Sequence, residues 1–211
     1  MNIDAIGLNR LAYRVFDELS MNSGQVLEDF GKSMLVKKIL MENKQDLLVY
    51  GSYMDKMGFV DEMKSMMSEL FQYAVDREDI DRAMENMDED SSTYRKLHDI
   101  RLIYEKFEEH NVKDSYIVAE QLSELLADNV DRSRFLADSY LYFDGFTGFT
   151  PIQLNLLRRI MACARDVKVV LTMDHRAYKK RILAEHELFY LTAETRRQLI
   201  RIADELHLPV K

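Results

Sequence analysis

The sequence predicts a mostly helical protein of the α/β class. Its 211 residues include only 7 glycines and 2 prolines, too few for an all-β fold with many tight turns, whereas 13 methionines accompany many Leu, Glu, Lys and Arg residues that favour helices. Apolar residues recur at helical spacing over the first two-thirds of the chain. From residue 140 a strand–loop–helix–strand pattern follows, the repeating element of a parallel sheet.

The first two-thirds of the chain predict a helical bundle. Apolar side chains three and four positions apart form one buried stripe on each helix, and short polar loops separate the stripes. The predicted helices cover residues 8–20, 27–40, 59–74, 94–107 and 117–126. Only the first few residues of this part resemble a strand.

The last third predicts an α/β element. Tyr140–Phe143 is a short aromatic and aliphatic run typical of a buried strand, and a turn at Asp144-Gly145 follows it. Thr150-Pro151-Ile152-Gln153 combines an N-cap threonine, a proline at the first helical position and a capping-box glutamine. We expect a helix there, a second strand over Val167–Met173 and a last helix over 192–207. Because parallel strands are normally buried on both faces, we expect further strands from the N-terminal residues or from sequence outside this chain, as in a piece of a larger protein.

The charge is divided unevenly. The net charge is −8, which argues against broad affinity for nucleic acids. Residues 1–139 carry 17 Lys and Arg against 29 Asp and Glu, a net −12, whereas residues 140–211 carry 12 against 8, a net +4. This division indicates two structural parts with different partners, or simply a solvated acidic helical face beside a more basic lobe.

The composition also favours a reduced, cytoplasmic protein. No apolar run is long enough to span a bilayer, no signal-peptide pattern begins the chain, and we expect no membrane partner. Cys163 is the single cysteine, which excludes an internal disulfide framework. The five histidines have no metal-ligand spacing, so we expect no metal site. No Ser, His and Asp order stands out either, so we expect no catalytic residue.

Two motifs invite a nucleotide-binding interpretation. Gly31-Lys32-Ser33 resembles the end of a phosphate loop, but Val26 stands where that loop needs its first glycine, and the triplet lies inside a helical pattern. We therefore reject it. Asp144 ends an apolar strand, as does the aspartate beside Mg²⁺ in P-loop enzymes, although from these residues alone a plain turn at a strand end is the better explanation.

Several cationic and aromatic side chains are of the kinds that bind single-stranded nucleic acid. Asn9, Arg10 and Tyr13 place an amide, a cation and a stacking ring within one turn of a helix, where an ordinary amphipathic helix end is the alternative. Other cations that could meet phosphates, or form solvated helix faces, are Arg158-Arg159, Arg176, Lys179-Lys180-Arg181 and Arg196-Arg197.

Four segments together resemble a known family. They are Leu8–Val15, Gly31–Leu35, Phe143-Asp144-Gly145-Phe146-Thr147-Gly148-Phe149-Thr150-Pro151-Ile152-Gln153 and Leu188–Thr195. Their order and spacing are similar to the N-terminal region of the B subunit of AddAB-type (RexAB-type) ATP-dependent helicase–nucleases. The resemblance covers essentially the whole chain, and the segment from Asp144 to Gln153 is its most specific part.

The resemblance implies a fragment of a larger protein that acts in DNA double-strand break repair. Residues 1–19 and 139–211 would belong to a partial superfamily 1 helicase-like core of the P-loop type, and residues 20–138 would form an inserted helical subdomain. A phosphate loop for ATP and Mg²⁺ would precede residue 1, and a nuclease domain with an iron–sulfur cluster would lie beyond residue 211. We expect no activity and no cofactor in this fragment itself.

The same resemblance implies a site. The family's A subunit is the motor, and its B subunit scans the passing DNA strand for the recombination hotspot Chi. Matching motifs assign strand contact to Asn9, Arg10, Tyr13, Phe146, Phe149 and Thr150. Asp144 matches a degenerate Walker B aspartate, and Gly145 replaces the glutamate of active helicases, so we expect no ATP turnover. The alternative is a structural module that docks on the motor subunit and touches no DNA.

Overall fold

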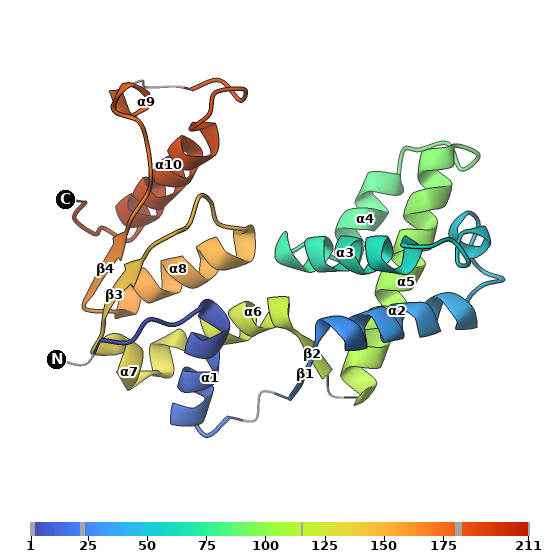
Figure 1. Ribbon diagram of the computed structural model, residues 1–211, viewed down its shortest axis with the longest axis horizontal. Helices are drawn as coiled ribbons and strands as arrows, with labels where there is room; N and C mark the ends of the chain where they lie inside the picture. The colour runs from blue at the N-terminus through green and yellow to red at the C-terminus, as the bar shows by residue number, and fades with distance from the viewer. Residues whose placement is uncertain (1–2, 22–23, 115, 180–182, 211) are drawn as a thin grey trace. The chain divides into compact units, whose positions relative to one another are not determined.

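The computed structural model describes residues 3–21, 24–114, 116–179 and 183–210, and their backbone is mostly helical (Figure 1). Its contacts divide the chain into two compact units. The α/β unit comprises Met1–Met21 and Ser123–Lys211, and the helical unit comprises Asn22–Leu122. The chain as a whole is mostly helical and of the α/β class as predicted, since each unit contains one two-stranded parallel sheet among its helices.

The α/β unit contains the predicted strand–helix–strand element. Strand β3 (Tyr140–Phe143) pairs in parallel with β4 (Asp166–Val169), and α8 (Pro151–Cys163) connects them and packs against β4. Alternation along β3 leaves Tyr140 and Tyr142 each 63% exposed and Phe143 buried. The side of the sheet that carries Phe143 therefore faces the core.

The other elements of this unit are helical. They are α1 (Leu8–Glu18), the later part of α6 (Ala119–Asn129), η2 (Val130–Arg132), α7 (Arg134–Ala137), α9 (His175–Lys179) and α10 (Tyr190–Glu205). Helix α1 buries one stripe, and the Glu18 carboxylate at its end accepts hydrogen bonds from the Ser133 hydroxyl and the Phe135 N–H. These bonds fix α1 to the start of α7.

The helical unit packs its helices around an apolar core. Its elements are β1 (Gln25–Leu27), α2 (Asp29–Glu42), η1 (Tyr50–Ser52), α3 (Phe59–Gln72), α4 (Arg77–Met84), α5 (Ser92–Asp114), β2 (Tyr116–Val118) and the start of α6. The core includes Ile39, Met63, Met67, Ile103 and Phe107, each at most 1% exposed. The methionines of α3 thus fill the core, as their helical spacing indicates.

The structure differs from the prediction at several elements. Strands β1 and β2 pair in parallel where we expected only helices, β4 ends at Val169 instead of Met173, and α4 was not predicted. Residues 3–7 contain no strand. Three-residue strands are too short to show alternation, and α4 has a single buried residue, Ile80, so neither leaves a periodic signal.

The two compact units meet at residues 122 and 123, whereas the expected end of the inserted subdomain at residue 138 stays a prediction. Residues 123–138 pack with the α/β unit because η2 and α7 contact α8, and Glu18 of α1 binds Ser133. None of the described helices is both long enough and apolar enough to cross a membrane.

Candidate nucleic-acid interface

Three of the predicted strand-contacting residues lie on α1. Asn9 and Arg10 are exposed and Tyr13 is 40% exposed, on the face opposite the buried Leu11, Ala12, Val15 and Phe16. Among the described residues, no carboxylate forms an ion pair with Arg10. Helix α1 therefore presents an amide, an unneutralised cation and a ring on one solvent-facing side.

The remaining predicted residues lie in the loop from β3 to α8. Asp144 is exposed, and its carboxylate accepts the N–H of Gly145 at 2.9 Å. Gly145 has a φ of +81°, a left-handed conformation that glycine adopts without strain. The structure thus forms the predicted turn at the end of the strand.

Two phenylalanines of this loop stack on each other. The ring centroids of Phe146 and Phe149 are 4.8 Å apart with 24° between the planes, and Phe146 also contacts the buried Phe143 at 6.2 Å. Both loop rings are half-buried. Each therefore keeps part of its surface open to solvent while the other ring holds it in place.

The loop is fixed at its far end by α8 and α10. The Thr150 hydroxyl accepts the Gln153 N–H, and the Gln153 amide oxygen accepts the Thr150 N–H at 3.0 Å, which completes the predicted capping box. The Thr195 hydroxyl of α10 lies 3.4 Å from the Thr147 carbonyl oxygen. The Thr150 oxygen therefore has a structural role in capping α8.

The structure brings the loop residues together but does not join them to α1. Figure 1 draws α1 below α8 and the β3–α8 loop above it. No hydrogen bond, ion pair or ring contact links Asn9, Arg10 or Tyr13 to Phe146, Phe149 or Thr150 in the described chain. The two groups are separate parts of one unit's surface.

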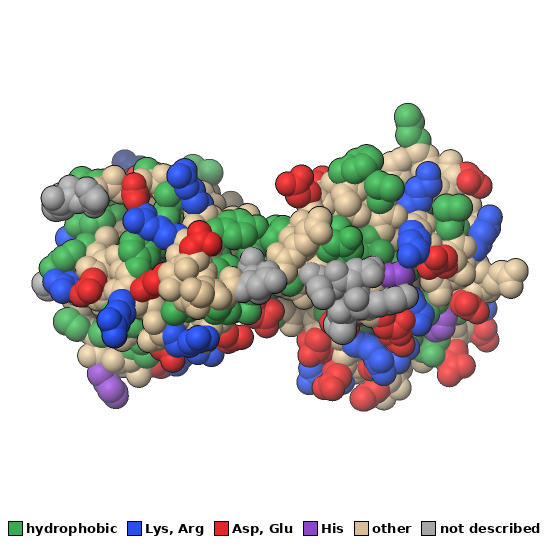
Figure 2. Space-filling view, turned by 90° about the horizontal axis from the view of Figure 1, so that it is seen from below, with side chains coloured by type: hydrophobic (Ala, Val, Ile, Leu, Met, Phe, Trp, Pro, Cys, Tyr) green, Lys and Arg blue, Asp and Glu red, His purple; other side chains and the backbone are tan. Residues whose placement is uncertain are grey.

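The two units also differ in net charge. The α/β unit carries 16 Lys and Arg against 15 Asp and Glu, a net +1, whereas the helical unit carries 13 against 22, a net −9. On the faces drawn in Figure 2, the helical unit shows numerous acidic side chains with Lys and Arg among them. Phosphates would be repelled by the helical unit and tolerated by the α/β unit.

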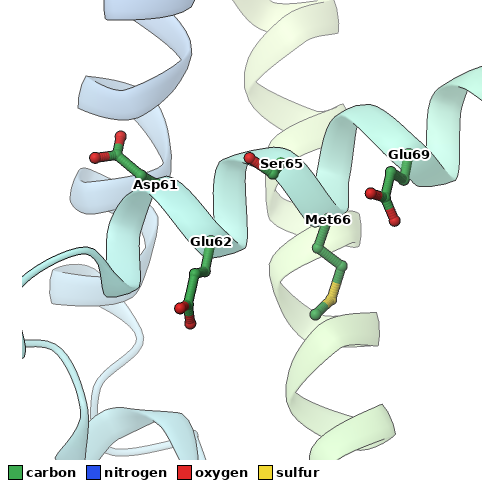
Figure 3. A pocket seen from close by; sticks show the side chains of 5 residues that line it. All are labelled: Asp61, Glu62, Ser65, Met66 and Glu69. Atoms are coloured by element: carbon green, nitrogen blue, oxygen red, sulfur yellow. The ribbon is translucent and has the colours of Figure 1, made fainter.

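A hollow of about 400 Å³ lies along α3. Figure 3 shows the five side chains that line it: Asp61, Glu62, Ser65, Met66 and Glu69. All come from successive turns of one helix, and the Asp61 carboxylate already accepts the Ser33 hydroxyl of α2 at 3.3 Å. This acidic strip lacks the converging polar groups of a ligand site.

The described residues form neither a cluster of metal ligands nor a phosphate loop. No group of three His, Cys, Asp or Glu side chains among them could hold a metal ion. Lys32, in the triplet that resembles a phosphate loop, lies within α2 and binds Glu120 and Ser68. Burial raises the pKa of the Cys163 thiol, which disfavours its thiolate form.

This chain is similar to known proteins over its full length. The family model described as "ADDB, N-terminal" matches residues 1–211. The chain belongs to the AddB N-terminal family. Proteins named as the B subunit of an ATP-dependent helicase/deoxyribonuclease are similar to it over nearly its full length, including that of Lachnoclostridium phytofermentans (41% identical over 210 residues, 100% of this chain) and that of Bacillus subtilis (32% over 209 residues, 96%).

A third relative, from Geobacillus kaustophilus, is 33% identical over 200 residues, 92% of this chain. It carries the same name as the other two. This member of the AddB N-terminal family spans about 18% of the length of the curated relatives that it matches.

Proposed function

We propose that this chain is the N-terminal part of the B subunit of an ATP-dependent helicase–nuclease that acts in DNA double-strand break repair and recombination. The observation that carries the proposal is the 41% identity over the full chain to a protein named as that subunit. In this proposal the α/β unit is part of the first helicase-like core, with β3, α8 and β4 as one of its repeats, and the helical unit is inserted into it. ATP, Mg²⁺ and the iron–sulfur cluster would be bound by other parts of the assembly.

The proposed role of the α/β unit is to contact single-stranded DNA during Chi recognition, without chemistry of its own. The half-buried rings of Phe146 and Phe149 offer stacking surface in a position fixed by the capped α8. Arg10, which has no ion pair among the described residues, offers a contact for phosphate or for a base edge. Within the described residues, the Asp144 carboxylate accepts only the Gly145 N–H, so its proposed role is to shape the loop.

The experiment compares Arg10→Ala with Arg201→Ala in the complete two-subunit enzyme. Both side chains are exposed, and neither forms an ion pair among the described residues, so the two substitutions remove the same charge from the same unit. We expect Arg10→Ala to weaken the response to Chi and Arg201→Ala to leave it unchanged. An unchanged response in Arg10→Ala removes Arg10 from the site.

A second candidate role, docking on the motor subunit, is favoured by the outer face of α2. Phe30, Met34 and Met41 are 77%, 60% and 62% exposed and lie along one side of this helix, opposite the buried Val36 and Ile39. Such an apolar stripe on a unit of net charge −9 suits a protein partner better than DNA.

The charge within this stripe favours a different chain over a second copy. Lys37 is exposed and lies between Met34 and Met41 on the same side of α2. A second copy would bring another Lys37 to the contact, whereas the motor subunit can supply a carboxylate. Met34→Glu should reduce copurification of the two subunits, and Met57→Glu, at a side chain that is 99% exposed off this helix, should not.

A further inference from the structure

A ring and a cation from two helices meet on the surface of the α/β unit. The Arg196 guanidinium of α10 lies over the Tyr178 ring of α9, with 5.0 Å between the guanidinium carbon and the ring centroid. Tyr178 is 58% exposed and Arg196 is exposed too. Between Arg176 and Tyr178, the Ala177 side chain is buried, which fixes α9 against the unit. The pair is therefore held in place and presented to solvent.

Two further cations, Arg176 and Lys179, lie beside Tyr178 in the sequence of α9. Five arginines of the α/β unit form ion pairs with carboxylates: Arg14, Arg158, Arg159, Arg165 and Arg197. No such pair is formed by Arg176, Lys179 or Arg196 within the described part of the chain.

The nearest acidic side chains in sequence are already engaged. The Asp174 carboxylate accepts the backbone N–H of Arg176 at 3.1 Å, and the Glu194 carboxylate pairs with Arg197 at 2.6 Å. Neither carboxylate forms an ion pair with Arg176, Lys179 or Arg196 in the described part of the chain, so these three cations can attract an external anion.

We infer that Arg176, Tyr178, Lys179 and Arg196 form a contact for single-stranded DNA that does not depend on base sequence. The Tyr178 ring can stack on any base because every base has a π-face, and the cations can meet the flanking phosphates. An acidic peptide would use the cations but would leave the exposed ring without a partner. The inference rests on the proposed function, because it takes DNA as the substrate, and it adds a contact separate from the residues assigned to Chi.

The test uses the full-length B subunit and a fluorescent oligo-dT strand that lacks Chi, titrated at two salt concentrations. We expect Tyr178→Ala and Arg196→Ala each to raise the Kd about tenfold. Arg196→Ala should also lower the slope of log K against log salt by about 0.7, the effect of one lost phosphate contact on a single strand. Tyr178→Phe, which keeps the ring, and Arg201→Ala, which removes an exposed cation from α10, should bind as wild type does. Wild-type affinity in both alanine variants, or no binding by wild type, overturns the inference.

A second measurement covers the case in which an alanine variant does not fold. An oligo-dT strand that carries 5-iododeoxyuridine is photocrosslinked to the wild-type B subunit, and the crosslinked peptide is identified by mass spectrometry. A crosslink at Tyr178 supports the inference, and a bound strand with crosslinks only elsewhere overturns it. The proposed Chi role and this inference can fail independently. If Arg10→Ala leaves the Chi response intact while Tyr178→Ala weakens binding to oligo-dT, only the Chi role of Arg10 is overturned.

Discussion

Lys32 and Glu120 form an ion pair that is almost fully buried, with 2.9 Å between Nζ and Oε1 and with side chains only 7% and 11% exposed. The same ammonium group donates to the Ser68 hydroxyl at 2.9 Å. One buried cation therefore joins α2, α3 and the first turn of α6 within the helical unit. In the Gly31-Lys32-Ser33 triplet, the lysine that would bind phosphate in a P-loop instead stabilises helix packing.

Lys32→Met should strongly destabilise the helical unit, because it leaves the Glu120 carboxylate buried without its cation. Breaking one partner of a buried pair costs about 3–5 kcal/mol, and we expect a loss of this size in the free energy of unfolding measured by urea titration. Lys38→Met is the control, since Lys38 and Glu42 are both 53% exposed at 3.9 Å and such a surface pair contributes about 1 kcal/mol or less. Equal losses in the two variants would contradict the structural role of Lys32.

The Asp99 side chain should stabilise the segment 48–50, which leads into η1. It is fully buried, and its carboxylate accepts the N–H groups of Leu48, Val49 and Tyr50 at 2.7–2.8 Å. Asp99→Ala leaves three donors without a partner, at about 1–3 kcal/mol for each donor that stays buried.

Hydrogen exchange of the three backbone amides measures the loss of these bonds. In Asp99→Ala we expect the three amides to exchange much faster than in wild type, whereas Asp46→Ala, at an exposed carboxylate of the same segment, should leave their exchange unchanged. Amides that stay protected in Asp99→Ala would show that another group holds this segment.

Local sequence signals predicted much of the fold, whereas the pairing of segments that lie far apart in the sequence was missed. The start of α8 was predicted because its cap, proline and glutamine lie within four consecutive residues, and strand β3 because its four residues are apolar or aromatic. Strand β1 pairs with β2 far away in the sequence, and neither contains a turn signal or an alternating pattern that could reveal the other.

The same limit applies to the candidate site. The loop residues Phe146 and Phe149 were predicted together, and they stack because they are neighbours in the chain. Whether α1 lies beside that loop depends on how α1 packs on the rest of the unit, which no local pattern encodes. Tyr178 was not singled out, because the Arg196 that stacks on it lies on another helix.

Acid should weaken the contact between α1 and α7 through Glu18. The Ser133 hydroxyl, and then the Phe135 N–H, hold the pKa of Glu18 below its ordinary value of 4.5, although partial burial opposes them. Since the folded-state pKa is the lower one, this stabilisation is fully present above pH 4.5 and is lost as pH falls through the folded-state value.

The measurement is the melting temperature of wild type and Glu18→Gln from pH 6 down to about pH 3. Wild type should be the more stable protein at pH 6, and its advantage should shrink as the pH falls below 4.5. Other carboxylates titrate in both proteins, so only the difference between the two curves reports Glu18. A constant difference would mean that the Glu18 contact does not depend on its charge.

Substitutions of Thr150 can separate its capping of α8 from its proposed contact with DNA. Its hydroxyl oxygen caps α8, so Thr150→Ala should lower the free energy of unfolding by about 1 kcal/mol, whereas Thr150→Asp and Thr150→Asn keep a good N-cap. The last two variants differ only in one negative charge, placed beside Phe149.

If a DNA strand passes over the β3–α8 loop, that charge should repel its phosphates. We expect Thr150→Asp to bind single-stranded DNA several-fold more weakly than Thr150→Asn in the full-length B subunit, with a difference that shrinks at high salt because screening weakens the repulsion. Urea titration of both variants checks that their stabilities match. Equal DNA affinities at low salt would place the strand away from this loop, and Thr150 would then serve only to start α8.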